Sequence, residues 1–224
     1  MSGPQPPGTP GVPIGERYVP AAGHRFLTRF YDPAMAMTMR EGTFRQALVR
    51  AAVAPQPASI LDVGCGTGSQ AIALADAAPH AQITAVDGDP DALARAHARG
   101  ANRSIVWTEA LAQDLPLPDD AVDCVTASLL LHHLSPATRL RALQEMRRVL
   151  RPGGRLHIAD WGRPQDPAMH LAFFAIRVLD GRENTADHAA GRIPQIIQSA
   201  GFSEVRVTRR MRTVLGTLEI VEAR

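Results

Sequence analysis

The sequence predicts a doubly wound α/β fold, in which a mostly parallel sheet is covered by helices on both faces. Two observations lead to this expectation. Short runs of β-branched and apolar residues alternate with helical patterns from Ser59 onward, and a glycine-rich turn separates the first run from the first helix. Neighbouring parallel strands require crossover connections, which these helices supply. The 224 residues suffice for one substantial core.

Strands are predicted at seven places, and the first five each precede a helix or a helical crossover. In chain order they are Ser59–Val63, Gln82–Asp87, Ile105–Trp107, Asp123–Ser128, Arg155–Asp160, and two closing strands near Val205–Val207 and Val214–Ile220. In sheets of this kind ligands bind outside the carboxyl ends of the strands. The residues that directly follow each strand are therefore the candidates for function.

The helices are placed by their start and stop signals. Asp89-Pro90 and Ser135-Pro136 each open a helix, because the first residue can cap free backbone amides and proline fits the first helical position. The second of these helices ends before Arg151-Pro152-Gly153-Gly154. Further helices are expected over Ser69–Ala78, about Pro167–Leu179 and about Pro194–Ala200, with His188 and Arg192 in the loop before the last one.

The chain divides by composition into three parts. Residues 1–20 are rich in proline and glycine and are expected to form a disordered tail. Residues 21–57 carry apolar residues at helical spacing and are expected to form an N-terminal helical cap. Residues 58–224 form the predicted main domain, with a lid helix inserted at about residues 164–192. The stretch Met169–Ile176 is apolar, which suits a lid over an apolar or aromatic molecule and equally suits core packing.

Composition limits the possible partners and compartments. A formal net charge of +2 gives no strong field, so no nucleic-acid partner is expected. Cys65 and Cys124 are the only cysteines, and no group of His, Cys and Asp has metal-ligand spacing, so neither disulfides nor a metal are expected. No apolar stretch approaches the ~18 residues of a membrane span, so no stable membrane insertion is expected. We expect a cytoplasmic protein, as a monomer or homodimer.

The turn from Gly64 to Gly68 is the main candidate site, because its three glycines permit positive φ and let a ligand approach without a Cβ in the way. The following helix presents free amides near Ser69 and Gln70 to an anionic or dipolar group. A dinucleotide fingerprint would need its third glycine at Ser69. Asp62, on the strand before the turn, would repel a pyrophosphate but attract an ammonium. The pattern therefore favours an amino-acid-bearing ligand.

Asp87 ends the second predicted strand, one strand-helix-strand unit after the glycine turn. Its two carboxylate oxygens can accept both hydroxyls of a ribose. The alternative is that Asp87 is a turn residue ahead of Gly88. The pattern alone leaves both interpretations open.

Motifs of a known family occur in order along the chain. They are Leu61–Gly68, Val86–Pro90, Leu115–Asp123, Leu131–Leu134 and Val149–Gly154. With them the sequence, from Ile60 to about Gly201, resembles the class I S-adenosylmethionine-dependent methyltransferases, in particular the branch of ubiquinone and menaquinone biosynthesis methyltransferases. The resemblance implies a Rossmann-like sheet of seven strands with the last one antiparallel, S-adenosyl-L-methionine as the cofactor, and methyl transfer as the reaction.

The same resemblance implies roles for individual residues. Asp62 and Gly64 would face the methionine ammonium of the cofactor, and Asp87 its ribose. The other residues implied at the cofactor site are Cys65, Gly66, Gln70, Gly88, Ala112, Gln113 and Leu129, with Ala112 and Gln113 at the adenine edge. Leu111 departs from the family pattern, which often has Asp four residues before the Leu-Pro pair. Either Gln113 or Asp114 replaces that hydrogen bond to adenine, or the bond is absent.

The cofactor's methyl group is already activated, so the protein mainly aligns an acceptor and excludes water. A protonated oxygen or nitrogen acceptor also needs a base, for which His133 is the candidate. The alternative is that one of His132 and His133 packs and the other caps the next helix. Asp160 and Trp161 are expected to contact the acceptor, although Trp161 suits the core equally well. Tyr31, from the cap, is a further acceptor-contact candidate.

The predicted function is S-adenosylmethionine-dependent methyl transfer to a small, apolar or aromatic acceptor. The sequence specifies neither the acceptor nor the atom that is methylated. Two alternatives are a nicotinamide-dependent oxidoreductase on a similar sheet and a cofactor-binding module without turnover. Ser69 and Asp62 argue against the first of these.

Overall fold

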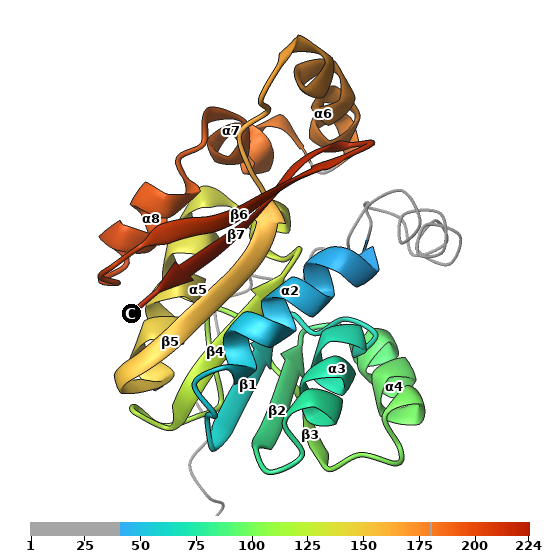
Figure 1. The fold of residues 1–224 in the computed structure, drawn as a ribbon, viewed down its shortest axis with the longest axis vertical. Helices are drawn as coiled ribbons and strands as arrows, with labels where there is room; N and C mark the ends of the chain where they lie inside the picture. The colour runs from blue at the N-terminus through green and yellow to red at the C-terminus, as the bar shows by residue number, and fades with distance from the viewer. Residues whose placement is uncertain (1–40, 180) are drawn as a thin grey trace, which may run out of the picture.

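The computed structural model describes residues 41–179 and 181–224 (Figure 1). The predicted tail, the part of the predicted cap that precedes Glu41, and Tyr31 lie outside the described residues. The described part of the predicted cap contains one helix, α2 (Glu41–Val53).

The described residues form a seven-stranded sheet with the strand order β3-β2-β1-β4-β5-β7-β6. Its strands are β1 (Ser59–Val63), β2 (Gln82–Asp87), β3 (Ile105–Glu109), β4 (Val122–Ser128), β5 (Leu150–Trp161), β6 (Arg206–Thr213) and β7 (Gly216–Ala223). Strands β1 to β5 are parallel, and β7 is antiparallel to both β5 and β6. The predicted doubly wound, Rossmann-like sheet with an antiparallel last strand is confirmed.

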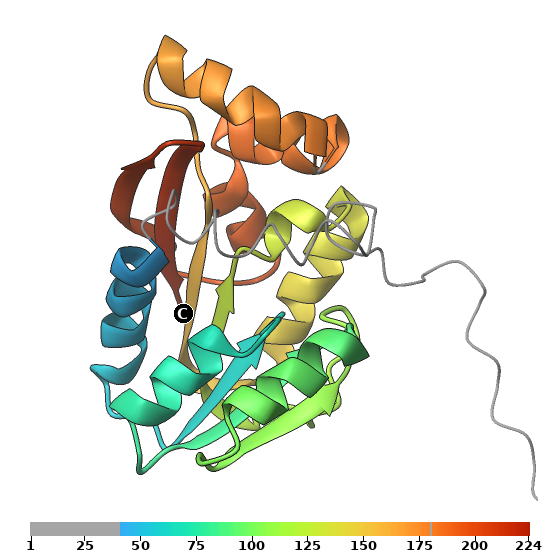
Figure 2. The same ribbon diagram turned by 90° about the vertical axis from the view of Figure 1, so that its right-hand side faces the viewer.

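Helices cover both faces of this sheet, as Figure 2 shows. Besides α2 they are α3 (Ser69–Ala77), α4 (Pro90–Arg99), the 3-10 turn η1 (Leu131–His133), α5 (Pro136–Val149), α6 (Pro167–Leu179), α7 (Arg182–Ala190) and α8 (Ile193–Ser199). On one face, α5 and α8 pack Leu143 and Ile197 into a cluster with β1, β4 and β5. On the other face, α2 and α3 bury Leu48 and Leu74.

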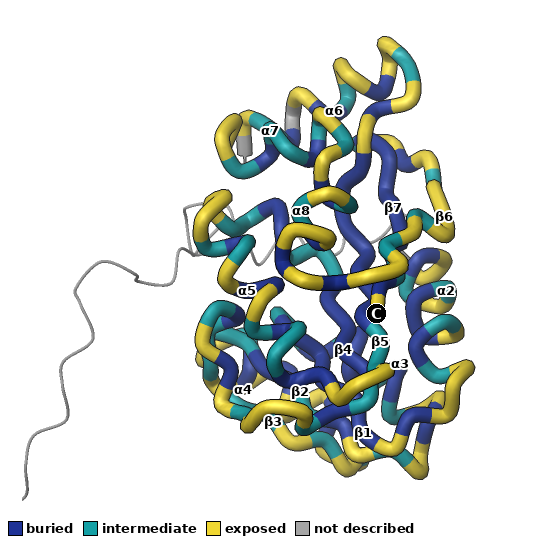
Figure 3. The backbone as a smooth tube through the Cα atoms, turned by 90° about the vertical axis from the view of Figure 1, so that its left-hand side faces the viewer, coloured by how far each residue is buried: buried dark blue, intermediate teal, exposed yellow. Residues whose placement is uncertain are grey.

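The middle of the sheet is buried and its edges are not (Figure 3). Every residue of β1 is buried, because helices lie on both of its faces. The edge strands β3 and β6 contain exposed residues. Helices α6 and α7 lie beyond the carboxyl end of β5 (Figure 1). Helix α7 also contacts η1, which follows β4, so these two helices lie next to the carboxyl ends of β4 and β5, where a ligand site is expected.

Two parts of the sequence prediction are corrected by the structure. Arg151-Pro152-Gly153-Gly154 was expected to precede the fifth strand but lies within β5, where a register shift in its pairing with β4 accommodates the irregular segment. His188 was expected in a loop but lies in α7 and is fully buried. Helix α7 has no continuous apolar stripe, which is the signal by which a helix is recognised in sequence.

Candidate functional site

The three glycines of the turn after β1 have positive φ angles of 69°, 52° and 80° at Gly64, Gly66 and Gly68. A Cβ on Gly64 would lie 2.7 Å from Cδ1 of Leu130, and one on Gly68 would lie 2.7 Å from Trp107. A Cβ on Gly66 would meet no atom within 4 Å. Close packing therefore explains why residues 64 and 68 are glycines. Gly66, in contrast, borders open space that a ligand can approach.

Asp87 holds this turn against the end of β2. Its Oδ2 accepts a hydrogen bond from Gly66 N at 2.7 Å, and its Oδ1 accepts one from Asp89 N at 2.9 Å. Burial raises the pKa of Asp87, and the hydrogen bonds from Asp89 and Gly66 oppose that shift. Each carboxylate oxygen has a second lone pair, so a ribose can still be bound here. Gly88, the other residue predicted here at the cofactor site, directly follows Asp87.

Asp62 is a buried carboxylate with one unused oxygen. Its Oδ1 accepts a hydrogen bond from Thr126 Oγ1 at 2.7 Å, and its Oδ2 has no partner among the described residues. Burial raises the pKa of Asp62 to about 7, with smaller opposing effects from Thr126, from the positive charge of Arg45 in α2 and from the Ala71 amide in the first turn of α3. A buried polar atom without a partner calls for a ligand or a water molecule.

Gln70, in the same first turn of α3, presents a second set of unused polar atoms. It is 2% exposed, and neither its amide oxygen nor its amide nitrogen has a partner among the described residues. The Cys65 thiol is buried, which raises its pKa and keeps it protonated. Unused buried donors and acceptors of Asp62 and Gln70 thus flank the glycine turn along the chain, at the end of β1 and the start of α3.

The predicted adenine residues lie in a tight turn after β3. The Ala110 amide donates to Asp87 O at 3.0 Å, which places this turn beside the end of β2. Leu111 opens the turn, and the Asp114 amide closes it by donating to Leu111 O at 3.0 Å. Ala112 is buried and Gln113 is half-buried. Ala112 and Gln113, the residues that the family resemblance implies for the adenine edge, therefore lie in a turn beside the end of β2.

Leu129 follows β4 with a φ of 54°, which is unusual for a residue other than glycine. Its amide donates to Ala159 O at 2.8 Å and fixes it beside β5. The next residue, Leu130, packs on Gly64. This backbone conformation directs the chain from β4 into η1, and strained backbone of this kind is frequent at ligand sites.

His132 in η1 pairs with Asp160 at the end of β5. His132 Nδ1 lies 2.7 Å from Asp160 Oδ1, and the ring is largely buried. Burial alone would raise the pKa of Asp160, but His132, His188 and the hydrogen bonds around it hold that pKa well below its usual range. Asp160 is thus ionised and can accept the Nδ1 proton of His132. The ring of His133 is tilted against that of His132, with the ring centroids 4.0 Å apart.

Asp160 and Trp161, the predicted acceptor contacts, are both buried. Asp160 is 3% exposed, and its Oδ2 and Oδ1 also accept hydrogen bonds from the amides of Leu131 and Trp161, both at 2.7 Å. Trp161 is 2% exposed and packs edge-on against Phe173 at 5.8 Å. This burial favours the core alternative for Trp161 and a supporting role for Asp160.

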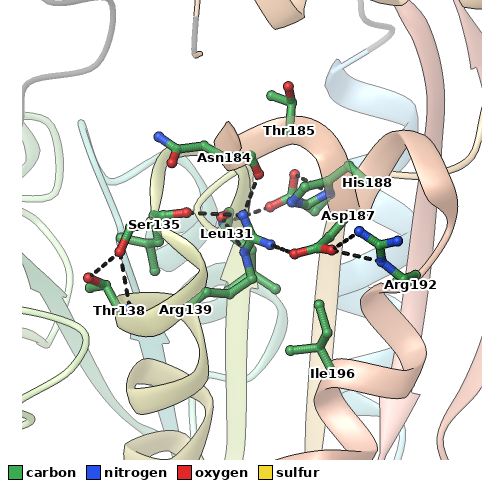
Figure 4. A network of polar contacts seen from close by, with 12 residues as sticks. Leu131, Ser135, Thr138, Arg139, Asn184, Thr185, Asp187, His188, Arg192 and Ile196 are labelled. Carbon is green, nitrogen blue, oxygen red and sulfur yellow. Dashed lines mark hydrogen bonds and ion pairs between the residues drawn. The ribbon is translucent and has the colours of Figure 1, made fainter. Parts of the chain in front are cut away.

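Sequence reasoning missed a buried arginine next to this site (Figure 4). Arg139 is fully buried in α5 and donates hydrogen bonds to Leu131 O and Leu134 O, each at 3.0 Å, and to Asp187 Oδ2 at 2.8 Å. The available signal was its position: Arg139 precedes Leu143 by four residues and therefore lies on the apolar stripe of the helix.

Two features are absent from the described residues. No group of three or more His, Cys, Asp or Glu side chains in residues 41–179 and 181–224 is arranged to hold a metal ion. None of the helices in these ranges combines the length and apolar character needed to cross a membrane.

Comparison with known proteins gives consistent matches. Residues 60–154 match a family model described as a methyltransferase domain. A ubiquinone/menaquinone biosynthesis C-methyltransferase from Desulfotalea psychrophila is 31% identical over 204 residues, which are 82% of this chain and 80% of that protein. A demethylmenaquinone methyltransferase from Thermus thermophilus is 37% identical over 134 residues, 58% of this chain. That match spans only 59% of the length of the Thermus protein. The match to a malonyl-[acyl-carrier protein] O-methyltransferase from Methylococcus capsulatus spans 64% of the length of that protein.

Solved structures share the fold. A structure described as a putative O-methyltransferase from Nostoc punctiforme matches with a TM-score of 0.69 at 21% identity, covering 86% of this chain and 58% of that one. A structure described as PigF with SAH matches with a TM-score of 0.63 at 23% identity, covering 88% of this chain and 56% of that one. At these identities the likeness concerns the architecture.

Proposed function

Because this chain belongs to the class I S-adenosylmethionine-dependent methyltransferases, we propose that it transfers the methyl group of S-adenosyl-L-methionine to a small, apolar or aromatic acceptor. The observation that carries this proposal is the set of unused buried polar atoms of Asp62 and Gln70, which stand on either side of the glycine turn in the chain. The comparisons do not favour the nicotinamide-dependent alternative.

The residues at the end of β1 fit this methyl donor. Burying a carboxylate is unfavourable, and the ammonium of a methionine group would add a hydrogen-bond donor and a positive charge at Asp62 Oδ2. The Gln70 amide can bind the methionine carboxylate, and Asp87 the ribose. When bound, the donor supplies a methyl group on a sulfonium, which needs no further activation. The chain's own residues then have to orient the acceptor, exclude water and receive a proton.

His132 meets the requirements of a base through its carboxylate partner. Asp160 orients the ring of His132 and fixes the proton on Nδ1, so that Nε2 has the lone pair that accepts a proton. The ring of His133 is tilted against that of His132, and its carbonyl accepts a hydrogen bond from Asn184. Because Asp160 orients the ring of His132, we propose His132 as the base in place of His133, with Asp160 as the residue that positions it.

Helices α6 and α7 are the proposed lid over the acceptor. Met169, Phe173 and Ile176 are buried, which joins α6 to the core around Trp161. Leu171, Phe174 and Val178 are 76%, 53% and 63% exposed, so α6 also has apolar surface that the core does not use. An element with this much apolar surface beside the carboxyl ends of the strands supports an apolar or aromatic acceptor.

Isothermal titration of the full chain with S-adenosyl-L-methionine tests the donor assignment. We expect saturable binding of the methyl donor and none of NADH. Transfer of a labelled methyl group to a panel of phenols, quinols and amines then tests turnover. Absence of donor binding at millimolar concentration would overturn the proposal, and binding without any methylated product would favour a module that lacks turnover.

The raised pKa of Asp62 predicts a pH-dependent affinity for the donor. With a pKa of about 7, the carboxylate is mostly protonated at pH 6 and half ionised at pH 7. Only the ionised form attracts an ammonium, so the affinity should rise about fivefold from pH 6 to pH 7. Titrations in buffers of different ionisation enthalpy should show the release of about half a proton at pH 7.

Asp62→Asn is the control for this prediction. The amide keeps the size of the side chain but cannot ionise, so the affinity of this variant should be at least about tenfold lower at pH 7.5 and should not vary between pH 6 and 7. If the variant showed the same pH dependence as the wild type, the titrating group would be another residue.

A further inference from the structure

We propose that Arg139 is a positioning residue that joins helix α7 to the turn η1, so that the lid and the base His132 are held as one unit. The proposal rests on the proposed function only in naming His132 as the base. The link itself is a property of this chain and can be measured without any acceptor. Figure 4 shows the contacts involved.

On the side of η1, Arg139 binds both ends of the turn that carries His132 and His133. Its Nε donates to Leu131 O and its Nη2 donates to Leu134 O, each at 3.0 Å. The amide of Leu131 is held in turn by Asp160 Oδ2 at 2.7 Å. Leu131 is thus fixed at its amide by β5 and at its carbonyl by α5, and the next residue is His132.

On the side of α7, the same guanidinium binds two residues that are 45 and 48 positions further along the chain. Its Nη1 donates to Asp187 Oδ2 at 2.8 Å, and its Nη2 donates to Asn184 O. Asn184 Nδ2 returns a hydrogen bond of 3.4 Å to His133 O. Helix α7 therefore contacts the turn both through Arg139 and directly.

Burying the charged guanidinium of an arginine costs more free energy than burying an apolar side chain. Burial lowers the pKa of Arg139, and the charges of Asp187 and Asp160 oppose that shift. An apolar side chain would fill this position on α5 without removing a charge from water, and such replacements are often neutral or stabilising. The planar guanidinium instead binds four oxygen atoms on two separate elements, which fixes their relative position.

Asp187 has a second partner, which provides a matched control. Arg192 donates from Nε to Asp187 Oδ1 at 2.9 Å, and its own side chain is 59% exposed. Removing Arg192 therefore takes away an exposed ion pair at one oxygen of the same carboxylate. Exposed pairs of this kind contribute little to stability. The buried bond from Arg139 to the other oxygen stays intact.

The test compares Asp187→Asn with Arg192→Gln by amide hydrogen exchange and by NMR of the histidine ring nitrogens. In Asp187→Asn we expect at least about tenfold faster exchange in α7 and also at His133 and Leu134, whose amides close η1, with changed or broadened ring signals of His132. In Arg192→Gln we expect both regions to stay within about twofold of the wild type.

Faster exchange confined to α7, with η1 and the His132 signals unchanged, would show that Arg139 anchors α7 without positioning the base. No change in either region would also overturn the proposal. If Asp187→Asn does not fold, Arg139→Lys replaces it, because a lysine keeps the charge but cannot bind all four oxygens, and the same readouts apply. A failure of the wild type to bind the methyl donor would instead refute the proposed function and leave these exchange results valid.

Discussion

Replacing His132 by Gln is expected to lower the rate of methyl transfer by about 10²-fold to 10⁴-fold, the range typical of a lost general base. The glutamine amide can still donate to Asp160, so the buried carboxylate keeps a partner and the end of β5 stays ordered. It has no basic nitrogen to take the acceptor's proton. The affinity for S-adenosyl-L-methionine should stay within about twofold, since Asp62 and Gln70 are untouched. Labelled-methyl transfer to the acceptor found in the panel measures the rate.

Two further variants make this prediction specific. Asp160→Asn should slow transfer as well, because an asparagine amide would donate to Nδ1 of His132 and move the ring proton to Nε2. His133→Gln should slow it less than about tenfold, because the ring that Asp160 orients is that of His132. A larger loss in His133→Gln than in His132→Gln would return the base to His133, the residue favoured by the sequence.

The sheet and the cofactor turn could be predicted because their signals are local. Strand β1, the glycines from Gly64 to Gly68 and helix α3 follow one another directly, and each has its own pattern. Asp87 is recognisable because it ends the next strand of the same unit. In the structure Asp87 also accepts a hydrogen bond from the Gly66 amide. This carboxylate therefore stabilises the glycine turn, in addition to the ribose binding proposed for it.

The acceptor side was less predictable because its contacts join distant parts of the chain. The pairing of His132 with Asp160 spans 28 residues, and the bond from Arg139 to Asp187 spans 48. No local pattern shows which of two adjacent histidines faces a carboxylate that far away. Helix α7 was missed because it is held by the buried Thr185 and His188, both polar residues, and not by an apolar stripe.

Gly66→Ala is expected to weaken binding of S-adenosyl-L-methionine by at least about tenfold with only a small loss of stability. The added Cβ would meet no protein atom within 4 Å, so the cost to folding is the positive φ of 52°, about 1 kcal/mol. In the proposed complex the donor occupies that open space, and the alanine side chain would collide with the donor. Titration calorimetry gives the affinity and urea unfolding gives the stability.

Variants at two other glycines separate the effect on donor binding from the effect on stability. Gly153 has a φ of 81° and no atom within 4 Å of an added Cβ, but it lies at the opposite end of β5 from Asp160 and Trp161. Gly153→Ala should therefore lose about 1 kcal/mol of stability and bind the donor normally. In Gly68→Ala the Cβ would lie 2.7 Å from Trp107 and 2.9 Å from the Ala96 Cβ, so stability should fall further, as overpacking adds to the strain. If Gly66→Ala bound the donor as well as Gly153→Ala does, the donor would not approach the turn at Gly66, and the placement built on Asp62 and Gln70 would have to change.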